Sequence, residues 1–300
     1  MPTLLSWPAL LYTLMHRPYI FVFLGAFLTI GIVNRGLKNT FLFLTLGFGI
    51  AYLSEFTSIR WAFPYGLYHY RYENLPGELL LWGVPLWDSL SYSFLAYAAY
   101  EYGGWLAPPH PGPLPKRERE SLLPLGEKVR MRGRIFLAAL LMTALDIVVD
   151  PLAVRGDRWF LGDIFYYPNG GTYFGVPLSN FTGWFLVALS IIGVYSWLSQ
   201  PTQARRPVPL PWLGPLFYWG ILGFNFMITA YLKEWKLLAC GLSLHLAILG
   251  AITRIAPTFR GFPCRQNLGP SECLPPSSQD KPDDPTKTGD SSRSPRPNPS

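Results

Sequence analysis

The sequence predicts an all-α fold, a polytopic membrane helix bundle of about seven transmembrane helices. Half of the 300 residues are hydrophobic and only 14% are charged, against about 25% in soluble globular domains. Aromatic residues make up 16%, among them 11 Trp and 17 Tyr, which suits two interfacial belts at the membrane surfaces. Seven apolar stretches come near the roughly 20 residues that a helix needs to cross the hydrocarbon layer. We therefore expect the lipid bilayer to surround the chain.

The seven stretches lie within residues 1–255, which we interpret as one transmembrane domain. A shorter apolar stretch, Leu4–Met15, is interrupted by Pro8 and is expected to form an interfacial helix rather than an eighth span. The predicted spans are Tyr19–Val33, Thr40–Glu55, Val84–Trp105, Arg134–Val149, Phe181–Leu198, Leu213–Leu232 and Lys236–Ile252.

Two segments resemble additions to this domain. Residues 108–133, between the third and fourth spans, combine Pro with dense charge and predict a flexible cytoplasmic loop. Residues 256–300 are rich in Pro, Ser and Asp and almost free of large apolar side chains. Because such a segment cannot bury enough surface to offset its ordering entropy, we expect a disordered cytoplasmic tail.

The Lys and Arg residues set the expected orientation, because cytoplasmic loops retain them. With seven spans, the N-terminus and the second, fourth and sixth loops share one side of the membrane, and that side carries seven of the 25 Lys and Arg. The remainder lie on the other side. We therefore expect a multi-pass protein of the cell membrane with its N-terminus outside and its C-terminus in the cytoplasm.

Several function classes lack the residues that they require. The net charge of +7 comes from Lys and Arg between the apolar runs and in the tail, not from a stripe, so nucleic acid is not an expected partner. Three Cys without CxxC spacing indicate neither a disulfide framework nor a zinc site. Four His without an HxxxH cluster do not suit a membrane di-iron oxygenase, and no phosphate-binding Gly loop is present. We expect no metal and no cofactor.

A short repeat opens two of the predicted spans. Residues 82–88 read WGVPLWD at the start of the third span, and residues 174–180 read FGVPLSN at the start of the fifth, which aligns Asp88 with Asn180. Gly-Val-Pro at a helix entrance supplies a turn and a fixed helical φ, and the aligned polar residue can cap or line the opening. Since both copies join an outgoing to an ingoing helix, we expect an internal repeat of helix pairs whose matching ends share one membrane face.

Three acidic side chains are the candidate catalytic groups. Asp146 and Asp150 are four residues apart, hence on one face of the fourth span near its outer end. Glu55 ends the second span, 28 residues before the first repeat glycine, while Asp146 lies 29 residues before the second. Carboxylates in an apolar helix are costly unless they face a cavity or find partners, which favours a functional role. The alternative for Asp150, just before Pro151, is a solvated interfacial position.

The loop after Glu55 carries a dense run of aromatic residues. It reads WAFPYGLYHY from Trp61, alternating aromatics with turn residues, and includes Tyr65 and Tyr68. Such a run can build a slot for a polyene or shield a carbocation with its ring faces. The equally weighted alternative is an interfacial aromatic belt.

Five strings together resemble one family of carotenoid biosynthesis membrane proteins, which includes the bacterial carotenoid 1,2-hydratases and the haloarchaeal bisanhydrobacterioruberin hydratase. The strings are FPYGLYHY, WGVPLWD, DIVVDPLAV, RGDRWF and YFGVPLSNFTGW, and the likeness runs from about Val22 to Ile252 without the 108–133 segment. The resemblance implies an enzyme that adds water across the terminal isoprenoid double bond of an acyclic carotene, lycopene-like or γ-carotene-like, and gives a tertiary alcohol.

Acid-catalysed hydration needs a carboxylic acid, aromatic faces and a positioned water, and it needs no redox cofactor. Under this resemblance we expect Asp146 to be the acid, with Glu55 or Asp150 guiding water. The expected substrate-binding residues are Tyr65, Tyr68, Trp87, Asp88, Tyr173, Asn180 and Trp184.

Two rival interpretations stay open. DIVVD has the DxxxD shape that can hold Mg²⁺ against a diphosphate, which suggests membrane prenyl transfer, although one such motif is visible where those enzymes usually have two. The repeat and the acids at helix ends also suit a carrier that binds carotenoid or lipid without altering it.

Overall fold

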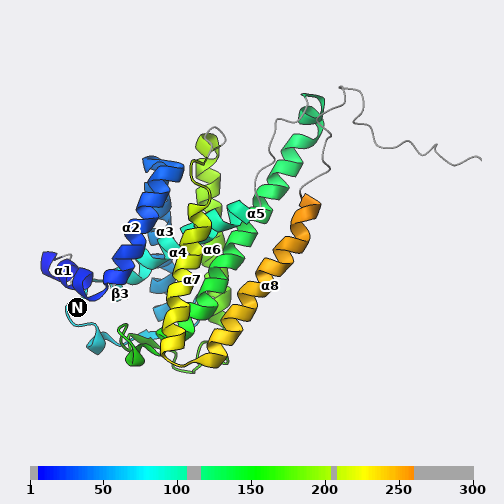
Figure 1. Cartoon of the computed structure of the whole chain (residues 1–300). Helices are drawn as coiled ribbons and strands as arrows, with labels where there is room; N and C mark the ends of the chain where they lie inside the picture. The colour runs from blue at the N-terminus through cyan, green and yellow to red at the C-terminus, as the bar shows by residue number, and fades with distance from the viewer. Residues whose placement is uncertain (1–5, 107–115, 204–207, 260–300) are drawn as a thin grey trace, which may run out of the picture. The chain divides into compact units, whose positions relative to one another are not determined.

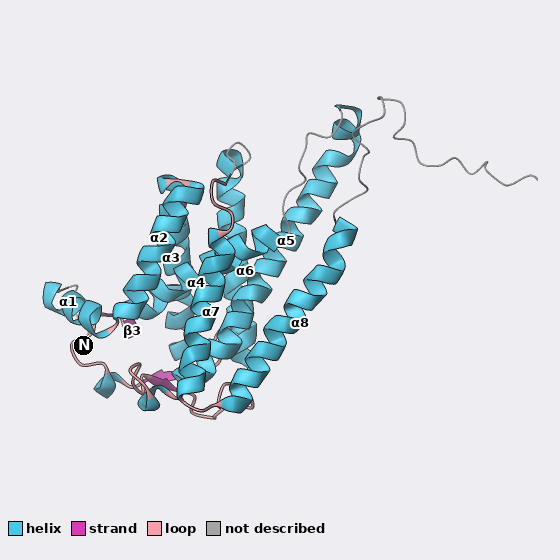
Figure 2. Ribbon diagram, viewed as in Figure 1, coloured by secondary structure: helices cyan, strands magenta, loops and turns pink. Residues whose placement is uncertain are grey.

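The computed structural model describes residues 6–106, 116–203 and 208–259, and this part of the chain is a helical bundle with short paired strands (Figures 1 and 2). One compact unit ends at Ala256. Its helices are α1 (Trp7–His16), α2 (Pro18–Arg35), α3 (Leu37–Trp61), α4 (Leu86–Leu106), α5 (Lys116–Ala153), α6 (Leu178–Gln203), α7 (Leu213–Tyr231) and α8 (Trp235–Phe259). The strands are β1 (His69–Tyr70), β2 (Leu80–Leu81), β3 (Val84–Pro85) and β4 (Phe165–Tyr166), with 3₁₀ turns η1 (Tyr72–Asn74) and η2 (Gly156–Arg158).

The membrane fold class is confirmed, and each of the seven predicted spans falls on one helix from α2 to α8. Within the described residues, five helices are long and apolar enough to cross a membrane: α2, α3, α5 from Met131, α6 and α7. The apolar part of α8, Trp235–Ala251, is shorter. A count of seven spans is therefore approximate, and α4 needs a separate explanation.

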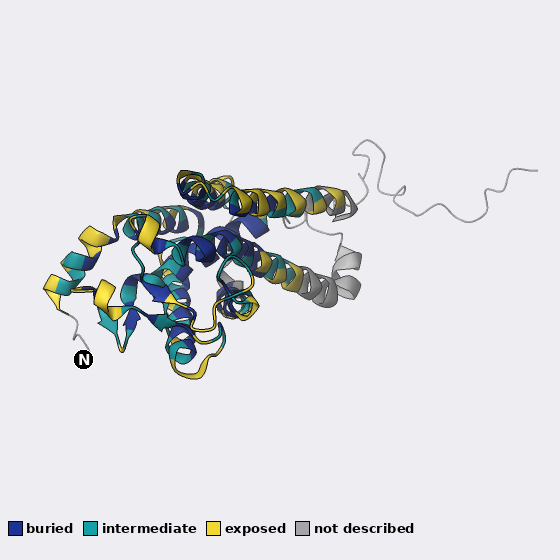
Figure 3. Cartoon of the chain, turned by 90° about the horizontal axis from the view of Figure 1, so that it is seen from below, coloured by how far each residue is buried: buried dark blue, intermediate teal, exposed yellow. Residues whose placement is uncertain are grey.

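Helix α4 lies at the centre of the bundle, where it contacts α2, α3, α5, α6 and α7. Ala96, Tyr97, Ala98 and Ala99 are fully buried, so the helix is covered on all sides over this turn. Its Ser and Tyr residues therefore face protein rather than lipid, which explains how a less apolar helix occupies the middle of a membrane bundle. Figure 3 shows the buried residues gathered on the inward faces of the helices.

The α3–α4 and α5–α6 connections meet at one end of the bundle, which we call the loop end (Figure 1). Strand β1 of the first connection pairs antiparallel with β4 of the second, with His69 opposite Tyr166 and Tyr70 opposite Phe165. The two matching loops of the repeat therefore lie side by side, as the sequence predicts.

The repeated GVPL segments form the same turn twice. Trp82 and Gly83 have φ of +46° and +88°, while Phe174 and Gly175 have +49° and +93°. Each pair sits between two bonded residues, Leu81 and Val84 in the first copy and Tyr173 and Val176 in the second. Two successive positive φ values define the tight hairpin turn that favours Gly at its second position. Helices α4 and α6 then begin directly after the repeated prolines, which confirms the internal repeat at the level of backbone geometry.

Helix α1 has ten residues, too few to span a bilayer, and exposes Trp7 and Met15. Its interfacial location stays a prediction. Residues 107–115 lie outside the described part, whereas α5 already begins at Lys116, so much of the segment predicted as a flexible loop is helical. Lys, Arg, Glu and Leu, which are abundant there, are strong helix formers. The predicted tail lies outside the described residues from position 260 onward.

Candidate active site

Four acidic side chains of the transmembrane helices lie toward the loop end. Glu55 is near the C-terminus of α3, Asp88 is in the first turn of α4, and Asp146 and Asp150 are in the last two turns of α5. Glu55 and Asp146 are each 1% exposed and Asp150 is 8% exposed, while Asp88 is partly buried. Because burying a carboxyl group is costly unless it finds partners, their hydrogen bonds define the site.

In the first half of the repeat, two acids are held by neighbouring hydroxyl groups. Ser89 on α4 donates to a carboxylate oxygen of Glu55. The Tyr70 hydroxyl donates to Oδ2 of Asp88 at 2.7 Å and lies 3.3 Å from the Tyr68 hydroxyl. The aromatic loop predicted from the sequence therefore contacts the first turn of α4 through a hydrogen-bonded chain.

In the second half, one amide joins two acids. Nδ2 of Asn180, on α6, donates to Oδ2 of Asp146 at 2.9 Å and to Oδ2 of Asp150 at 2.7 Å. The Tyr167 hydroxyl adds a third bond, to Oδ2 of Asp150 at 2.8 Å. Oδ1 of Asp146 is buried and has no partner among the described residues.

The two halves use similar bonds at positions that do not all match. Glu55 bonds a side chain 34 positions later on α4, and Asp146 bonds one 34 positions later on α6. A tyrosine from the adjoining loop binds a further acid in each half, Tyr70 in one and Tyr167 in the other. The bound acid follows the repeated turn in the first half and precedes it in the second, so the repeat holds for the backbone turns and not for each side chain.

The loop tyrosines act as hydrogen-bond donors over the whole ordinary pH range. Tyr68, Tyr70 and Tyr167 are between 4% and 8% exposed, and burial raises the pKa of each well above its usual value. The hydroxyl groups of Tyr70 and Tyr167 therefore stay protonated and donate to Asp88 and Asp150. Each tyrosine bond orients the carboxyl group through one of its two oxygens, and the other carboxyl oxygen takes no part in that bond.

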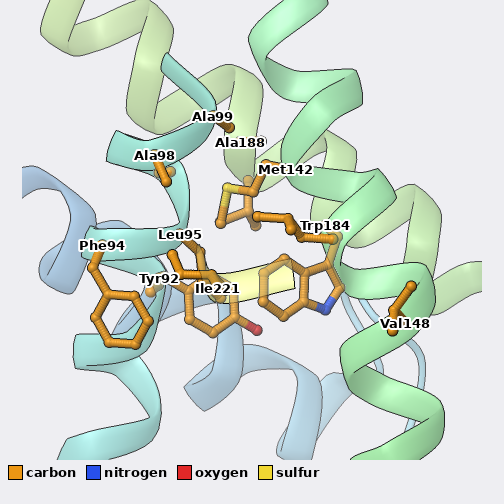
Figure 4. Packing of buried hydrophobic residues seen from close by; sticks show 14 of the residues in the cluster. Tyr92, Phe94, Leu95, Ala98, Ala99, Met142, Val148, Trp184, Ala188 and Ile221 are labelled. Atoms are coloured by element: carbon orange, nitrogen blue, oxygen red, sulfur yellow. The ribbon is translucent and has the colours of Figure 1, made fainter. Parts of the chain in front are cut away.

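Aromatic rings pack beside the acids. Tyr92 and Trp184 stack with ring centroids 4.2 Å apart and an interplanar angle of 11°, as Figure 4 shows from close by. Tyr65 lies 6.1 Å from Tyr92 and 6.3 Å from Trp184, and its hydroxyl is 2.8 Å from that of Ser54. The stack joins α4 to α6, so each helix pair contributes one of its rings.

A cavity of about 100 Å³ lies among α2, α4, α5, α6, α7 and the loop after η2. Its wall includes the acids Asp88 and Asp150, and otherwise it is mostly apolar. The apolar lining includes Tyr19, Ile20, Phe23, Phe94, Ile221 and Phe224. The two acids each come from a different half of the repeat, so the cavity joins the halves at the loop end.

Comparison with known proteins identifies the family. A sequence family described as "Carotenoid biosynthesis protein" matches residues 15–248, more than three quarters of the chain. The chain belongs to this carotenoid biosynthesis family. No curated protein and no solved structure gives a significant match. The resemblance inferred from the five sequence strings is thereby confirmed at the level of the family, and the protein is a multi-pass membrane protein of carotenoid biosynthesis.

The predicted site residues of this carotenoid biosynthesis protein fall into three groups. Four of them line the cavity, namely Trp87, Asp88, Asp150 and Trp184. Five others bond or pack against residues of that wall or lie within electrostatic range of it, namely Glu55, Tyr65, Tyr68, Asp146 and Asn180. Tyr173 is apart from both groups and packs on Phe174 and Phe181. The catalytic and binding roles of all ten stay predictions.

Sequence reasoning missed Tyr70, Tyr167, Ser89 and Tyr92. The signal for the first two was present, because each lies in the loop between a helix-ending acid and the following GVPL segment. The partner of each tyrosine was not evident, since the spacing to Asp88 or Asp150 differs between the halves.

A buried ion pair supports the cavity wall from the α1–α2 junction. The guanidinium of Arg17 donates to Oε1 of Glu78 at 2.7 Å, and both side chains are at most 5% exposed. Trp87 Nε1 donates to Glu78, and the Arg17 guanidinium lies 4.6 Å from the Trp87 ring centroid. The pair therefore fixes the orientation of an aromatic ring that lines the cavity.

The two acids of the DxxxD motif share one partner in the carotenoid biosynthesis protein. Asp146 and Asp150 both accept bonds from the Asn180 amide group. Within the described part of the chain, no three His, Cys, Asp or Glu residues are grouped so that they could hold a metal ion.

Proposed function

We propose that the protein is a carotenoid hydratase, which adds water across the terminal isoprenoid double bond of an acyclic carotene end to form a tertiary alcohol. The proposed substrate is lycopene-like or γ-carotene-like and reaches the site from the lipid bilayer. The observation that carries the proposal is the small apolar cavity whose wall presents Asp88 and Asp150. A hydrocarbon site with two carboxyl groups suits proton transfer to an alkene and needs no redox cofactor.

In the proposed reaction, the Asp150 carboxyl group donates its proton to the less substituted alkene carbon. A C–H bond forms as the π bond breaks, which leaves a tertiary cation. Water then forms the C–O bond, and the Asp88 carboxylate accepts the surplus proton. The two groups lie within electrostatic range of each other, and return of the proton to Asp150 closes the cycle.

The choice of Asp150 over Asp146 follows from the cavity. Asp150 lines it, and Tyr167 and Asn180 both bond its Oδ2, so neither bond uses Oδ1. Asp146 does not line the cavity and shares the Asn180 amide, so we assign it to positioning Asp150 through that amide. We assign Glu55 a related role beside Asp88 in the first half, because the two carboxyl groups lie within electrostatic range of each other.

The rings of Trp87 and Trp184 also line the cavity, and both are nearly fully buried. An aromatic face stabilises a nearby cation by up to about 2 kcal/mol when water is excluded. We assign these rings to shielding the cation, while Tyr70 holds Asp88 in position to accept a proton.

The proposal is tested by expression in a host that makes lycopene, with the carotenoids analysed by mass. Wild-type protein should yield product heavier by one water per reacted end. Asp150→Asn and Asp88→Asn should each lower product at least a hundredfold, because each removes an acid–base group. Asp163→Asn is the matched control, since that carboxyl group is 37% exposed and pairs with Arg71 outside the cavity.

Each outcome distinguishes between the possible functions, provided that immunoblots show equal amounts of protein in the membrane. Unchanged lycopene in the wild type would refute the hydratase proposal and leave a carrier. A prenylated product that depends on Mg²⁺ would favour the prenyl-transfer alternative. Full product from Asp150→Asn would remove Asp150 as the proton donor.

We also propose that the N-terminus lies outside the cell membrane and the C-terminus in the cytoplasm, which puts the loop end in the outer half of the bilayer. The support is the distribution of Lys and Arg in the sequence. A Cys introduced at Asp163, whose side chain is 37% exposed in a loop, should react with a membrane-impermeant thiol reagent in whole cells. Reaction only after cell lysis would reverse the orientation.

A further inference from the structure

The cavity is too small for a carotene. Its volume of about 100 Å³ is less than the roughly 150 Å³ of an engineered protein cavity that binds benzene. By that measure it accepts about four carbon atoms, close to the size of one terminal isoprenoid unit. If the chain acts on a carotene end, most of the hydrocarbon must therefore lie elsewhere.

A second hollow adjoins the cavity on the outer face of α7. We call it the outer pocket, and it is lined by Trp159, Phe160, Met227, Ile228 and Tyr231, with a volume of about 380 Å³. Phe160, Met227 and Tyr231 are each more than half exposed, so this hollow opens on the surface of the helix bundle. Apart from the hydroxyl of Tyr231 and the Trp159 ring nitrogen, its side chains are entirely apolar.

The two hollows meet at Trp159, whose side chain lines both of them. Phe160 lines the outer pocket and packs on two rings that line the cavity, with centroids 5.2 Å from Tyr19 and 6.3 Å from Phe224. Trp159 and Phe160 lie edge to face, 4.9 Å apart. These aromatic side chains therefore form the boundary between the cavity and the outer pocket.

The loop that carries Trp159 and Phe160 is fastened by an ionic clamp, which consists of Arg155, Arg158 and Glu234. Glu234, in the α7–α8 turn, accepts from Nε of Arg155 at 3.1 Å and from Nη1 of Arg158. Arg158 also donates to the Leu232 carbonyl at 2.7 Å. The clamp thus holds the RGDRWF segment against the end of α7 that forms the other side of the outer pocket.

We propose that the outer pocket binds the conjugated polyene chain of the carotene while the terminal isoprenoid unit occupies the cavity. The inference rests on the proposed function, because that function requires a carotene end beside Asp88 and Asp150. Flat aromatic rings suit a conjugated chain, and the hollow begins where the cavity ends. Trp159, which lines both hollows, is then the side chain along which the polyene passes.

The test fills the outer pocket without changing the cavity. Met227 is 61% exposed and lines the outer pocket alone, so Met227→Trp should obstruct it. Leu216→Trp is the matched control, because Leu216 is 60% exposed on the same helix and lines neither hollow. In lipid nanodiscs, Met227→Trp should raise KM for lycopene about tenfold and leave kcat unchanged, whereas Leu216→Trp should match the wild type.

A five-carbon alkene with the same trisubstituted double bond provides a second comparison. It fits within the cavity, so Met227→Trp should hydrate it at the wild-type kcat/KM. Equal loss on the short and the long substrate would overturn the proposal, because the substitution would then act on the chemistry or the folding. Equal KM for lycopene in the two Trp variants would overturn it as well.

Binding is measured separately from turnover, as lycopene retained per protein after purification and read by visible absorbance. Retention should fall several-fold in Met227→Trp and stay unchanged in Leu216→Trp. If Met227→Trp leaves lycopene retention unchanged and instead lowers the amount of bound phospholipid, the outer pocket binds an acyl chain and the inference is overturned. If Met227→Trp lowers lycopene retention but the wild type forms no hydrated product, the proposed function is refuted and the binding site is supported.

Discussion

Replacement of one small residue at the α3–α4 interface provides a direct test of the packing that brings Glu55 and Ser89 together. A Cβ atom added at Gly47 would lie 2.8 Å from both Cα and Oγ of Ser93, whereas ordinary contacts begin near 3.4 Å. Because one of these atoms is backbone, the helices must separate by roughly half an ångström. Overpacking of this kind typically costs about 1–3 kcal/mol.

Gly49→Ala is the matched control, because a Cβ there meets nothing within 4 Å on the same helix. Replacing Gly by Ala inside a helix gains up to about 1 kcal/mol at either position, so this term cancels in the comparison. We therefore expect Gly47→Ala to be about 1–3 kcal/mol less stable than Gly49→Ala. Unfolding by SDS in mixed micelles, followed by Trp fluorescence, measures the difference.

A further substitution separates the two contacts at Gly47. Ser93→Ala removes Oγ and leaves Cα in place, so in the Gly47→Ala background it should restore part of the lost stability and not all of it. Identical SDS midpoints for Gly47→Ala and Gly49→Ala would refute the reasoning, because helix separation would then cost nothing.

Two other predictions concern the aromatic stack and the ionic clamp. Trp184→Ala should cost about 3–5 kcal/mol in the same SDS assay, since it deletes a 5% exposed ring stacked on Tyr92, and Trp184→Phe should cost less than half as much. A hydrogen bond from Arg158 lowers the pKa of Glu234 below its ordinary 4.5, so the clamp contributes stability above that pH and loses it as the pH falls through the lowered pKa. Hydrogen exchange of the backbone amides of residues 155–160 should therefore accelerate on acidification in the wild type. In Glu234→Gln, which should cost up to about 1 kcal/mol of stability, this exchange should be fast at every pH. Equal protection of these amides in the wild type and in Glu234→Gln at pH 7 would count against the clamp.

Much of the fold follows from the sequence because a bilayer imposes simple requirements on length and polarity. Apolar runs indicated α2, α3 and α5–α8 without knowledge of their neighbours. Helix α4 was predicted too, although its Ser and Tyr residues make it less apolar, and its central position explains that composition. The GVPL repeat correctly placed the two loops at one end, since chain direction alone determines that arrangement.

The site was less predictable because it depends on helix rotation. Asp146 and Asp150 share one face of α5, and periodicity does not distinguish them. In the structure only Asp150 lines the cavity, which the loop after η2 helps to enclose. Similarly, the partners Tyr70 and Tyr167 reach their acids through the β1–β4 pairing, a contact between segments almost a hundred residues apart.

Neither helix pair alone builds the chamber, because Asp88 belongs to the first pair, Asp150 to the second, and the β1–β4 strands join them. Because both pairs belong to one chain, matching positions need not carry the same side chain. Position 88 is an aspartate and the matching position 180 is an asparagine, so the two pairs bring different chemistry to the same end of the bundle.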